Sequence, residues 1–189
     1  MHNPHLLGIS GSLRRDSFST AILRTLREEL SPGVDLVLHS LDEVPLYNQD
    51  LDTETPPPGV RRLRAAIAES DGLVIVSPEF NYGVPGILKN ALDWASRPYG
   101  TSALIGKPVL TMTASPAFTG GVRAQAQLNE TLLATQSRLV IRPQTVIGSV
   151  HEKILDGRLI DPPSLQFALQ AISGLLREAG LAEQLELAA

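Results

Sequence analysis

Short apolar runs alternate with longer stretches of helical spacing along this chain. The runs are rich in branched aliphatic residues, which favours buried strands, whereas the longer stretches repeat apolar residues every three or four positions. Five strands are expected, at His5 to Ser10, Val34 to Ser40, Gly72 to Ser77, Pro108 to Thr113 and Leu139 to Ile147. Helices are expected over about 18–30, 58–70, 84–97 and 122–135, and a fifth helix closes the chain from about Leu165 to a stop at Gly180.

This alternation of strand and helix predicts a single α/β domain over residues 1–189. Because the strands are nearly continuous apolar runs, we expect a doubly wound, five-stranded parallel sheet with helices on both faces. Ligands of such sheets bind at the carboxyl ends of the strands. The loops after the first, third and fourth strands are therefore where a site is expected.

The composition is that of a globular protein. The 189 residues include 16 basic and 20 acidic side chains, for a net charge of -4, and 43% are hydrophobic, which disfavours a nucleic-acid binder and a disordered chain. No apolar stretch reaches the roughly 20 residues that span a bilayer and no signal peptide is visible, so a cytoplasmic protein is expected. The chain has no cysteine, so any redox chemistry must come from a cofactor.

The loop after the first strand is rich in hydroxyl groups and arginine, and it leads directly into a helix. It runs from Ser10 to Thr20 as SGSLRRDSFST. A helix N-terminus offers free N–H groups and a partial positive charge, so this loop predicts a site for a phosphate monoester. In the alternative interpretation, Ser17 or Ser19 only caps the helix and Gly11 only eases a tight turn. Neither a dinucleotide-binding glycine fingerprint nor a P-loop is present.

The loops after the third and fourth strands fit a flat ring. The first, Ser77 to Gly86, is shaped by two prolines and two glycines, and its Phe80 and Tyr82 either stack on a ligand or anchor the loop by packing. The second, Thr113 to Gly121, is small, hydroxylated and rich in glycine. Three such loops suit a planar phosphorylated cofactor, of which FMN is the simplest.

Two segments resemble the NAD(P)H-dependent FMN reductases of flavodoxin-like fold, which include quinone, chromate and azo-dye reductases. PEFNYGVPGILKNALDWASRP, from Pro78 to Pro98, is similar to the family's ring-binding segment, and GSLRRDSFST, from Gly11 to Thr20, is similar to its phosphate loop. The resemblance implies the sheet order 2-1-3-4-5. It also implies the following cofactor-binding residues: Ser12, Arg14, Ser17, Ser19 and Thr20 around the phosphate, Pro78, Glu79, Phe80, Asn81 and Tyr82 along the ring, and Ser115, Gly120 and Gly121 in the remaining wall.

The same resemblance implies the activity. FMN would take a hydride from NADPH or NADH and pass electrons to a quinone, free flavin or similar acceptor, with no catalytic side chain and with ping-pong kinetics. Two positions depart from the family pattern, since Ser19 stands where Asn is usual and Phe80 where Tyr is frequent. A homodimer or homotetramer is implied, and Trp94 and Arg97 are expected at a subunit contact.

Other functions were weighed against this one. A serine hydrolase using Ser10 or Ser12 with His151 lacks an orienting carboxylate shortly before the histidine, and a phospho-acceptor domain lacks its acidic residues. The four histidines are scattered, so no metal site is expected. The remaining alternative is a flavodoxin-like electron carrier without nicotinamide turnover, although the dense acidic surface of such carriers is missing.

Overall fold

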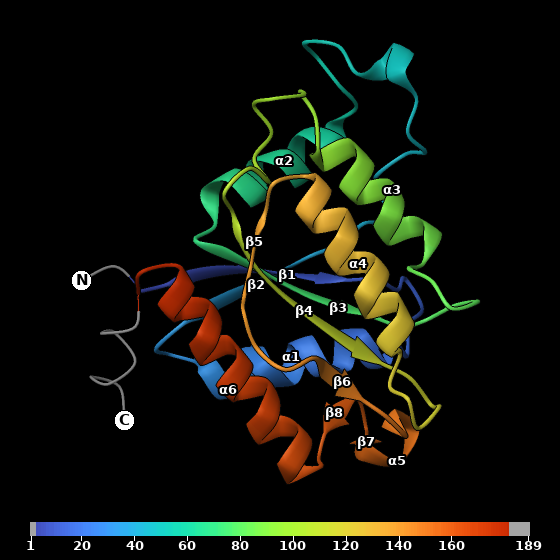
Figure 1. Ribbon diagram of the computed structural model, residues 1–189, viewed down its shortest axis with the longest axis vertical. Coiled ribbons are helices and arrows are strands. Elements are labelled where there is room, and N and C mark those ends of the chain that lie inside the picture. Colours follow the sequence, from blue (N-terminus) through green and yellow to red (C-terminus); the bar gives the residue numbers. More distant parts are fainter. Residues whose placement is uncertain (1–2, 182–189) are drawn as a thin grey trace.

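The computed structural model describes residues 3–181 as a parallel sheet between two layers of helices (Figure 1). The sequence leaves open whether the final segment, Leu181 to Ala189, is a frayed tail or a small packing contact, and most of this segment lies outside the described residues. The strands are β1 His5–Ser10, β2 Asp35–His39, β3 Gly72–Ser77, β4 Pro108–Ala114, β5 Arg138–Leu139, β6 Thr145–Ile147, β7 Ile154–Leu155 and β8 Arg158–Leu159. The helices are α1 Phe18–Leu30, the 3₁₀ turn η1 Gln49–Leu51, α2 Pro58–Glu69, α3 Gly86–Ala95, α4 Val122–Ala134, α5 Val150–Lys153 and α6 Pro162–Glu178.

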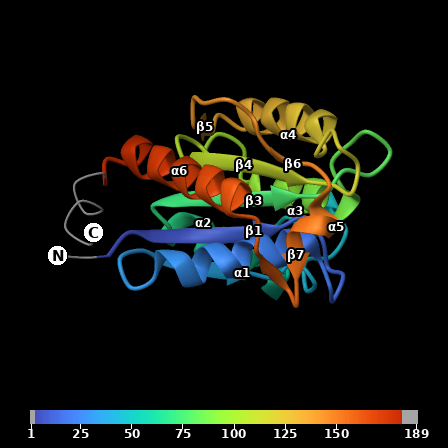
Figure 2. The same ribbon diagram turned by 90° about the horizontal axis from the view of Figure 1, so that it is seen from below.

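The main sheet has the order β2-β1-β3-β4-β5, all parallel, as the family resemblance implies. The carboxyl ends of β1, β3 and β4 therefore meet at one edge (Figure 2). In a sheet with this order, the order of the strands reverses between β1 and β3, and ligands bind beside that point. No helix among residues 3–181 is long and apolar enough to cross a bilayer.

The two faces of the sheet bury separate hydrophobic clusters. Along β3, Leu73 and Ile75 pack beneath α2, α3 and α4, whereas Val74 and Val76 pack beneath α1 and α6. All four side chains are 0% exposed. This is the alternation of a strand that is covered on both faces, and it explains why an unbroken apolar run is a strand here.

The expectation of a single fifth strand over Leu139 to Ile147 is wrong. β5 pairs with the start of β4, β6 pairs with its end, and the segment between them leaves the sheet. Pro143 lies in that segment and has no N–H to donate to the ladder. Ile141 in this segment is 94% exposed. Its apolar side chain therefore wrongly indicated a continuous buried strand.

Trp94 is not a surface residue, so the expectation that it forms a subunit contact is wrong. Its side chain is 0% exposed, and its Nε1–H donates to the carbonyl of Pro45 at 2.8 Å. The ring of Tyr47 meets it edge-on at a centroid distance of 4.8 Å. Trp94 follows Leu88 and Ala91 on one face of α3, and that face is turned to the core.

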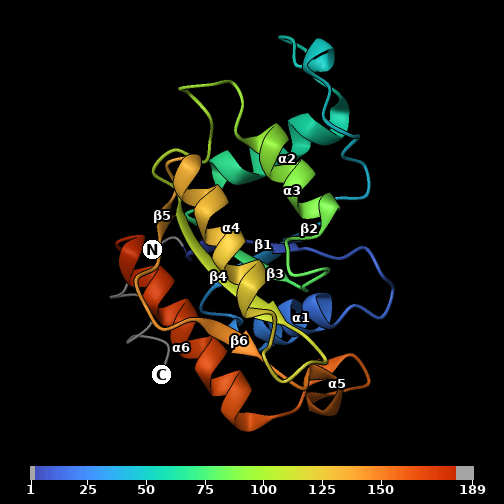
Figure 3. The ribbon, with the colours of Figure 1, turned by 45° about the vertical axis from the view of Figure 1, so that its right-hand side comes forward.

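The acidic residues and prolines of Tyr47 to Gly59 predict an exposed connection, and the segment that carries η1 within it projects away from the body (Figure 3). A small hairpin of β7 and β8 was not expected. In it, Asp156 and Gly157 have φ angles of 48° and 75°. The Asp-Gly dipeptide is a strong signal for a two-residue hairpin turn, so the sequence did carry this information.

Candidate functional site

The β1–α1 loop is held in place by its own hydrogen bonds. The N–H of Gly11 donates to the carbonyl of Val76 on β3 at 2.8 Å. The hydroxyl of Ser10 donates to the carbonyl of Ser12 at 3.1 Å and accepts from the hydroxyl of Thr20 at 2.9 Å. A Cβ at Gly11 would lie 2.9 Å from the Ser77 hydroxyl, so glycine is needed for this close approach to β3.

The first turn of α1 keeps unused hydrogen-bond donors. Ser17 is the N-cap residue, and its hydroxyl oxygen accepts from the N–H of Thr20 at 3.2 Å. The N–H groups of Phe18 and Ser19 have no partner in the part of the chain that the structure describes. The hydroxyl oxygen of Ser12 accepts from the N–H of Arg14 at 3.3 Å. The protons of both serine hydroxyls therefore remain free to donate to an anion.

The capping and turn roles of the alternative interpretation are present in the structure. Ser17 does cap the helix, and Gly11 does permit a tight turn. The caps, however, leave two N–H groups and several hydroxyls around the positive end of the helix, with the guanidinium of Arg14 beside them. This donor set fits a phosphate.

One cavity of about 290 Å³ joins the three loops. Its walls come from the β1–α1, β3–α3 and β4–α4 loops, which lie next to each other because β1, β3 and β4 are neighbours in the sheet. The lining residues are Ser12, Arg14, Ser17, Phe18, Ser19, Pro78, Glu79, Phe80, Ala114, Ser115 and Pro116. The cavity is thus polar and cationic at the helix end and apolar along the other two loops.

The β3–α3 loop forms a tight reverse turn at the rim of this cavity. The N–H of Phe80 donates to the carbonyl of Gly83 at 3.1 Å, and the N–H of Gly83 donates back at 2.9 Å. Asn81 and Tyr82 between them have φ angles of 48° and 65°, as a type I′ turn requires. The rings of Phe80 and Tyr82 are 61% and 70% exposed, so they do not anchor the core.

Glu79 connects two loops of the site. Its carboxylate accepts hydrogen bonds from the N–H groups of Arg123 and Ala124, at 3.0 and 2.9 Å. These N–H groups belong to the first turn of α4, whose N-cap residue Gly121 has no side chain to cap them. A carboxylate at a helix N-terminus is stabilised by the helix dipole, so Glu79 fixes the distance between the two walls.

The β4–α4 loop contributes through Ser115, whereas its glycines are structural. Ser115 lines the cavity, and its hydroxyl oxygen accepts from the N–H of Ala117 at 3.2 Å. Gly120 and Gly121 have φ angles of 65° and 86° and lie outside the lining residues. A Cβ at Gly121 would lie 3.2 Å from the Cβ of Thr113, so both the backbone angle and the packing require glycine.

Most of the expected residues therefore line one cavity in the structure, and five of them lie outside it. The expected residues that line the cavity are Ser12, Arg14, Ser17, Ser19, Pro78, Glu79, Phe80 and Ser115. Thr20 faces a neighbouring groove, Asn81 and Tyr82 form the exposed turn, and Gly120 and Gly121 lie behind the wall.

Three residues of the cavity were missed. Phe18, Ala114 and Pro116 line it beside the expected residues. Phe18 packs against the core, and because it lies at the first helical position of α1, next to the phosphate loop, it also lines the cavity. Ala114 and Pro116 are the sequence neighbours of Ser115, and this position beside an expected residue could have predicted that they line the cavity.

Comparison with known proteins gives consistent matches along the chain. The profile of the NADPH-dependent FMN reductase family matches residues 4–152. An NAD(P)H-dependent FMN reductase of Pseudomonas aeruginosa is 37% identical over 171 residues, which covers 90% of this chain and 92% of that protein. A quinone reductase of Escherichia coli K12 is 38% identical over 159 residues, which covers 82% of this chain and 84% of that protein.

A solved structure shares the whole fold. The flavoenzyme NAD(P)H:(acceptor) oxidoreductase FerB of Paracoccus denitrificans superimposes with a TM-score of 0.79 at 28% identity, covering 96% of this chain and 98% of that one. The relatives are enzymes, and the expected alternative of a carrier without nicotinamide turnover is not supported. The protein is an oxidoreductase of flavodoxin-like fold whose cofactor is FMN and whose electron donor is NAD(P)H, and the chain belongs to the NADPH-dependent FMN reductase family.

Proposed function

We propose that FMN lies in the cavity between the three loops, with its phosphate at the first turn of α1. The observation that carries this proposal is the convergence of unused donors there. They are the N–H groups of Phe18 and Ser19, the hydroxyl protons of Ser12 and Ser17, and the guanidinium of Arg14. Together they match the charge and the acceptor atoms of a phosphate monoester.

Ser19 takes the place at which the family usually has Asn. Its residue surface is only 1% exposed, so its hydroxyl reaches the cavity over a small area. Thr20 acts indirectly in this proposal, because its hydroxyl donates to Ser10 and thereby helps to shape the loop.

The ring of FMN would extend from the phosphate between the two other loops. Pro78 and Phe80 offer an apolar wall, and Ser115 borders the opposite side. Glu79 positions these walls through its bonds to α4. Gly120 and Gly121 allow the β4–α4 loop to take its shape. Asn81 and Tyr82 form the rim of the cavity on the side of the β3–α3 loop. We infer that residues 1–189 act as one FMN-binding domain.

FMN held in this cavity would supply the redox chemistry, namely hydride transfer from NAD(P)H and electron transfer to an acceptor. The residues of this chain bind, orient and border that cofactor. The exposed rings of Phe80 and Tyr82 flank the open side of the cavity, where a nicotinamide or an acceptor ring would stack. If both substrates use this side in turn, ping-pong kinetics follow.

A quinone is the acceptor that we propose for this chain. The support is the names of the relatives, among which quinone reductases of Pseudomonas putida and Escherichia coli recur at 36% to 38% identity. Because NAD(P)H is held inside the cell, we place the reaction in the cytoplasm. Free flavin and similar acceptors remain within reach of an open site of this kind.

We also propose a homodimer or homotetramer. The face around α3 and α4 exposes apolar side chains, with Tyr99 at 85%, Leu133 at 60% and Ile105 at 38% exposure. Arg97 borders a hollow of about 310 Å³ on the same face. Light scattering on a size-exclusion column measures the mass of the assembly, and a monomer at micromolar concentration would contradict this proposal.

The test of the function uses the purified protein loaded with FMN. Under anaerobic conditions, NADPH should bleach the visible flavin absorption, and a quinone should then restore it. In the steady state, NADPH oxidation should depend on the quinone, with parallel lines in double-reciprocal plots. A flavin that stays oxidised with both NADPH and NADH would instead identify an electron carrier.

A further inference from the structure

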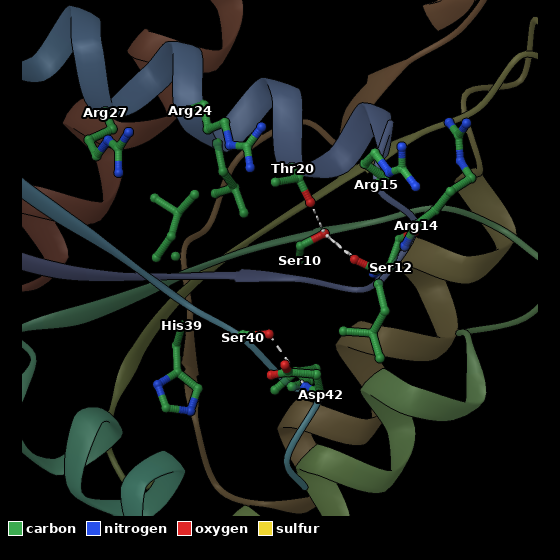
Figure 4. Close-up of a pocket in the computed structure, with 15 residues that line it drawn as sticks. Ser10, Ser12, Arg14, Arg15, Thr20, Arg24, Arg27, His39, Ser40 and Asp42 are labelled. Atoms are coloured by element: carbon green, nitrogen blue, oxygen red, sulfur yellow. Dashed lines mark hydrogen bonds between the residues drawn. The ribbon is translucent and has the colours of Figure 1, made fainter. Parts of the chain in front are cut away.

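A second, larger cavity lies on the other side of the β1–α1 loop. It is a groove of about 450 Å³ between α1 and the edge strand β2 (Figure 4). Gly8, Leu23, Leu38 and Leu41 line its apolar floor, where Leu38 is partly exposed and the other three residues are buried. The proposed FMN site uses none of these four residues.

Gly8 lies in the floor of the groove, in the middle of β1. Glycine weakens a strand because it has no side chain to pack. A Cβ at this position would lie 3.2 Å from Cδ2 of Leu23, 3.4 Å from Cδ1 of Leu36 and 3.6 Å from Cδ1 of Leu38. Glycine therefore lets these leucine side chains approach β1 closely beneath the groove.

The rim of the groove is strongly cationic. Arg15, Arg24 and Arg27 line it from α1 and the residue segment just before it, and none of them is in an ion pair within residues 3–181. By contrast, Arg62 and Arg158 elsewhere on the surface are each paired with a glutamate.

The opposite rim comes from the end of β2 and the residues that follow. Figure 4 shows Arg24 and Arg27 reaching from α1 over the groove, with His39 and Ser40 across from them. Asp42 is the carboxylate among the lining residues, so the arginines outnumber it. Burial and the charge of Arg62 lower the pKa of His39, although Asp42 opposes this shift, so His39 offers a neutral imidazole near pH 7.

An apolar floor with a cationic rim has a specific ligand chemistry. Arginine forks bind phosphate oxygens in pairs, and leucine side chains cover the face of a purine or similar ring. We propose that the groove between α1 and β2 is a second phosphate site, which takes a nucleoside phosphomonoester with its base against the partly exposed Leu38 and its phosphate between Arg24 and Arg27.

This ligand chemistry has two sources. One is the adenosine half of NADPH, whose 2′-phosphate is a phosphomonoester, and the other is a free mononucleotide. The groove adjoins the proposed FMN cavity, since Ser12 and Arg14 line both. The NADPH source rests on the proposed function, whereas the site itself does not.

The binding test uses the FMN-loaded protein and adenosine 2′,5′-bisphosphate as the probe. Isothermal titration calorimetry should detect binding to the native protein, and the double variant Arg24→Gln/Arg27→Gln should bind at least about tenfold more weakly, the scale of one lost charge-assisted contact. The matched control is Arg61→Gln, which removes an exposed arginine of α2 and should leave the affinity unchanged. The flavin spectrum of each protein reports whether the FMN site is intact.

A kinetic arm distinguishes the two sources. If the groove binds the adenosine half of NADPH, the probe should compete with NADPH. The KM for NADPH should then rise in the double variant, whereas the KM for NADH should not. Tight binding without competition identifies a free mononucleotide. Both results support the site, and the calorimetric result supports it even if the protein proves unable to oxidise NADPH. Absent binding at millimolar probe, or equal affinity in the native protein and the double variant, overturns it.

Discussion

The carboxylate of Glu79 accepts a hydrogen bond from the backbone N–H of Ala124 at 2.9 Å. The two residues are 45 positions apart in sequence, and the bond joins the loop after β3 to the first turn of α4. Since Gly121 cannot cap the helix through a side chain, Glu79 does so from a neighbouring loop. One contact thus supports a helix and sets the spacing of two walls of the FMN cavity.

Replacing Glu79 should lower stability through this cap. We expect Glu79→Ala to reduce the free energy of unfolding by about 1 to 2 kcal/mol, the cost of a lost N-cap. Glu79→Gln keeps an acceptor oxygen and should lose less. Urea denaturation measures both, with Glu130→Ala in the exposed part of α4 as the control. Equal losses for Glu79→Ala and the control would show that the cap contributes nothing.

Replacing Arg14 should weaken FMN binding. Its guanidinium lies beside the unused donors of α1, where it also stacks 5.1 Å from the centroid of the Phe18 ring. Arg14→Ala should cost roughly 1.5 to 3 kcal/mol of FMN affinity, the scale of a hydrogen bond to a charged group. Fluorescence titration of the apoprotein measures it, with Arg61→Ala for comparison. An unchanged dissociation constant would remove Arg14 from the phosphate site.

Alanine substitutions at Gly121 and Gly100 separate the stability cost of backbone strain from the stability cost of steric crowding. Gly121 has a φ of 86°, and its new Cβ would lie 3.2 Å from Thr113 and 3.3 Å from Glu79. Gly100 has a φ of 80° with nothing within 4 Å of a new Cβ. Gly100→Ala should therefore cost about 1 kcal/mol from strain alone, and Gly121→Ala more. Thermal unfolding measures the loss of stability in both variants. A smaller loss for Gly121→Ala than for Gly100→Ala would contradict this prediction.

Asp161 should make the stability depend on pH. Hydrogen bonds from the side chain and backbone of Ser164 lower the pKa of this N-cap carboxyl of α6. The folded-state pKa lies below the unfolded value, so the carboxylate stabilises the fold above about pH 4 and this contribution is lost as the pH falls through the folded-state pKa. Asp161→Asn keeps a capping oxygen without the charge. The difference in the free energy of unfolding between the native protein and Asp161→Asn should shrink in acid. A constant difference from neutral to strongly acidic pH would contradict this prediction.

Local signals in the sequence predicted most of the fold. The apolar runs placed β1 and β3 at their observed bounds, and helical spacing did the same for α1. The division of the fifth strand escaped notice because Ile141 looks like a strand residue, and only the pairing with β4 shows that it leaves the sheet.

The site was predictable only as far as it is local. Ser12, Arg14 and Ser17 belong to one continuous loop, and the structure keeps them in one cavity. The contacts between distant segments were not predictable. The cap from Glu79 to α4 is one example, and the groove that Arg24 of α1 lines together with His39 of β2 is another.

The central claim is that the first turn of α1 binds the phosphate of FMN. The most direct measurement compares the dissociation constants of FMN and riboflavin, which lacks only the phosphate, for the apoprotein and for Arg14→Ala. The account predicts that FMN binds the native apoprotein at least about a hundredfold more tightly than riboflavin, since several charge-assisted bonds are involved, and that Arg14→Ala narrows this ratio. Equal affinities of the native apoprotein for FMN and riboflavin would contradict it.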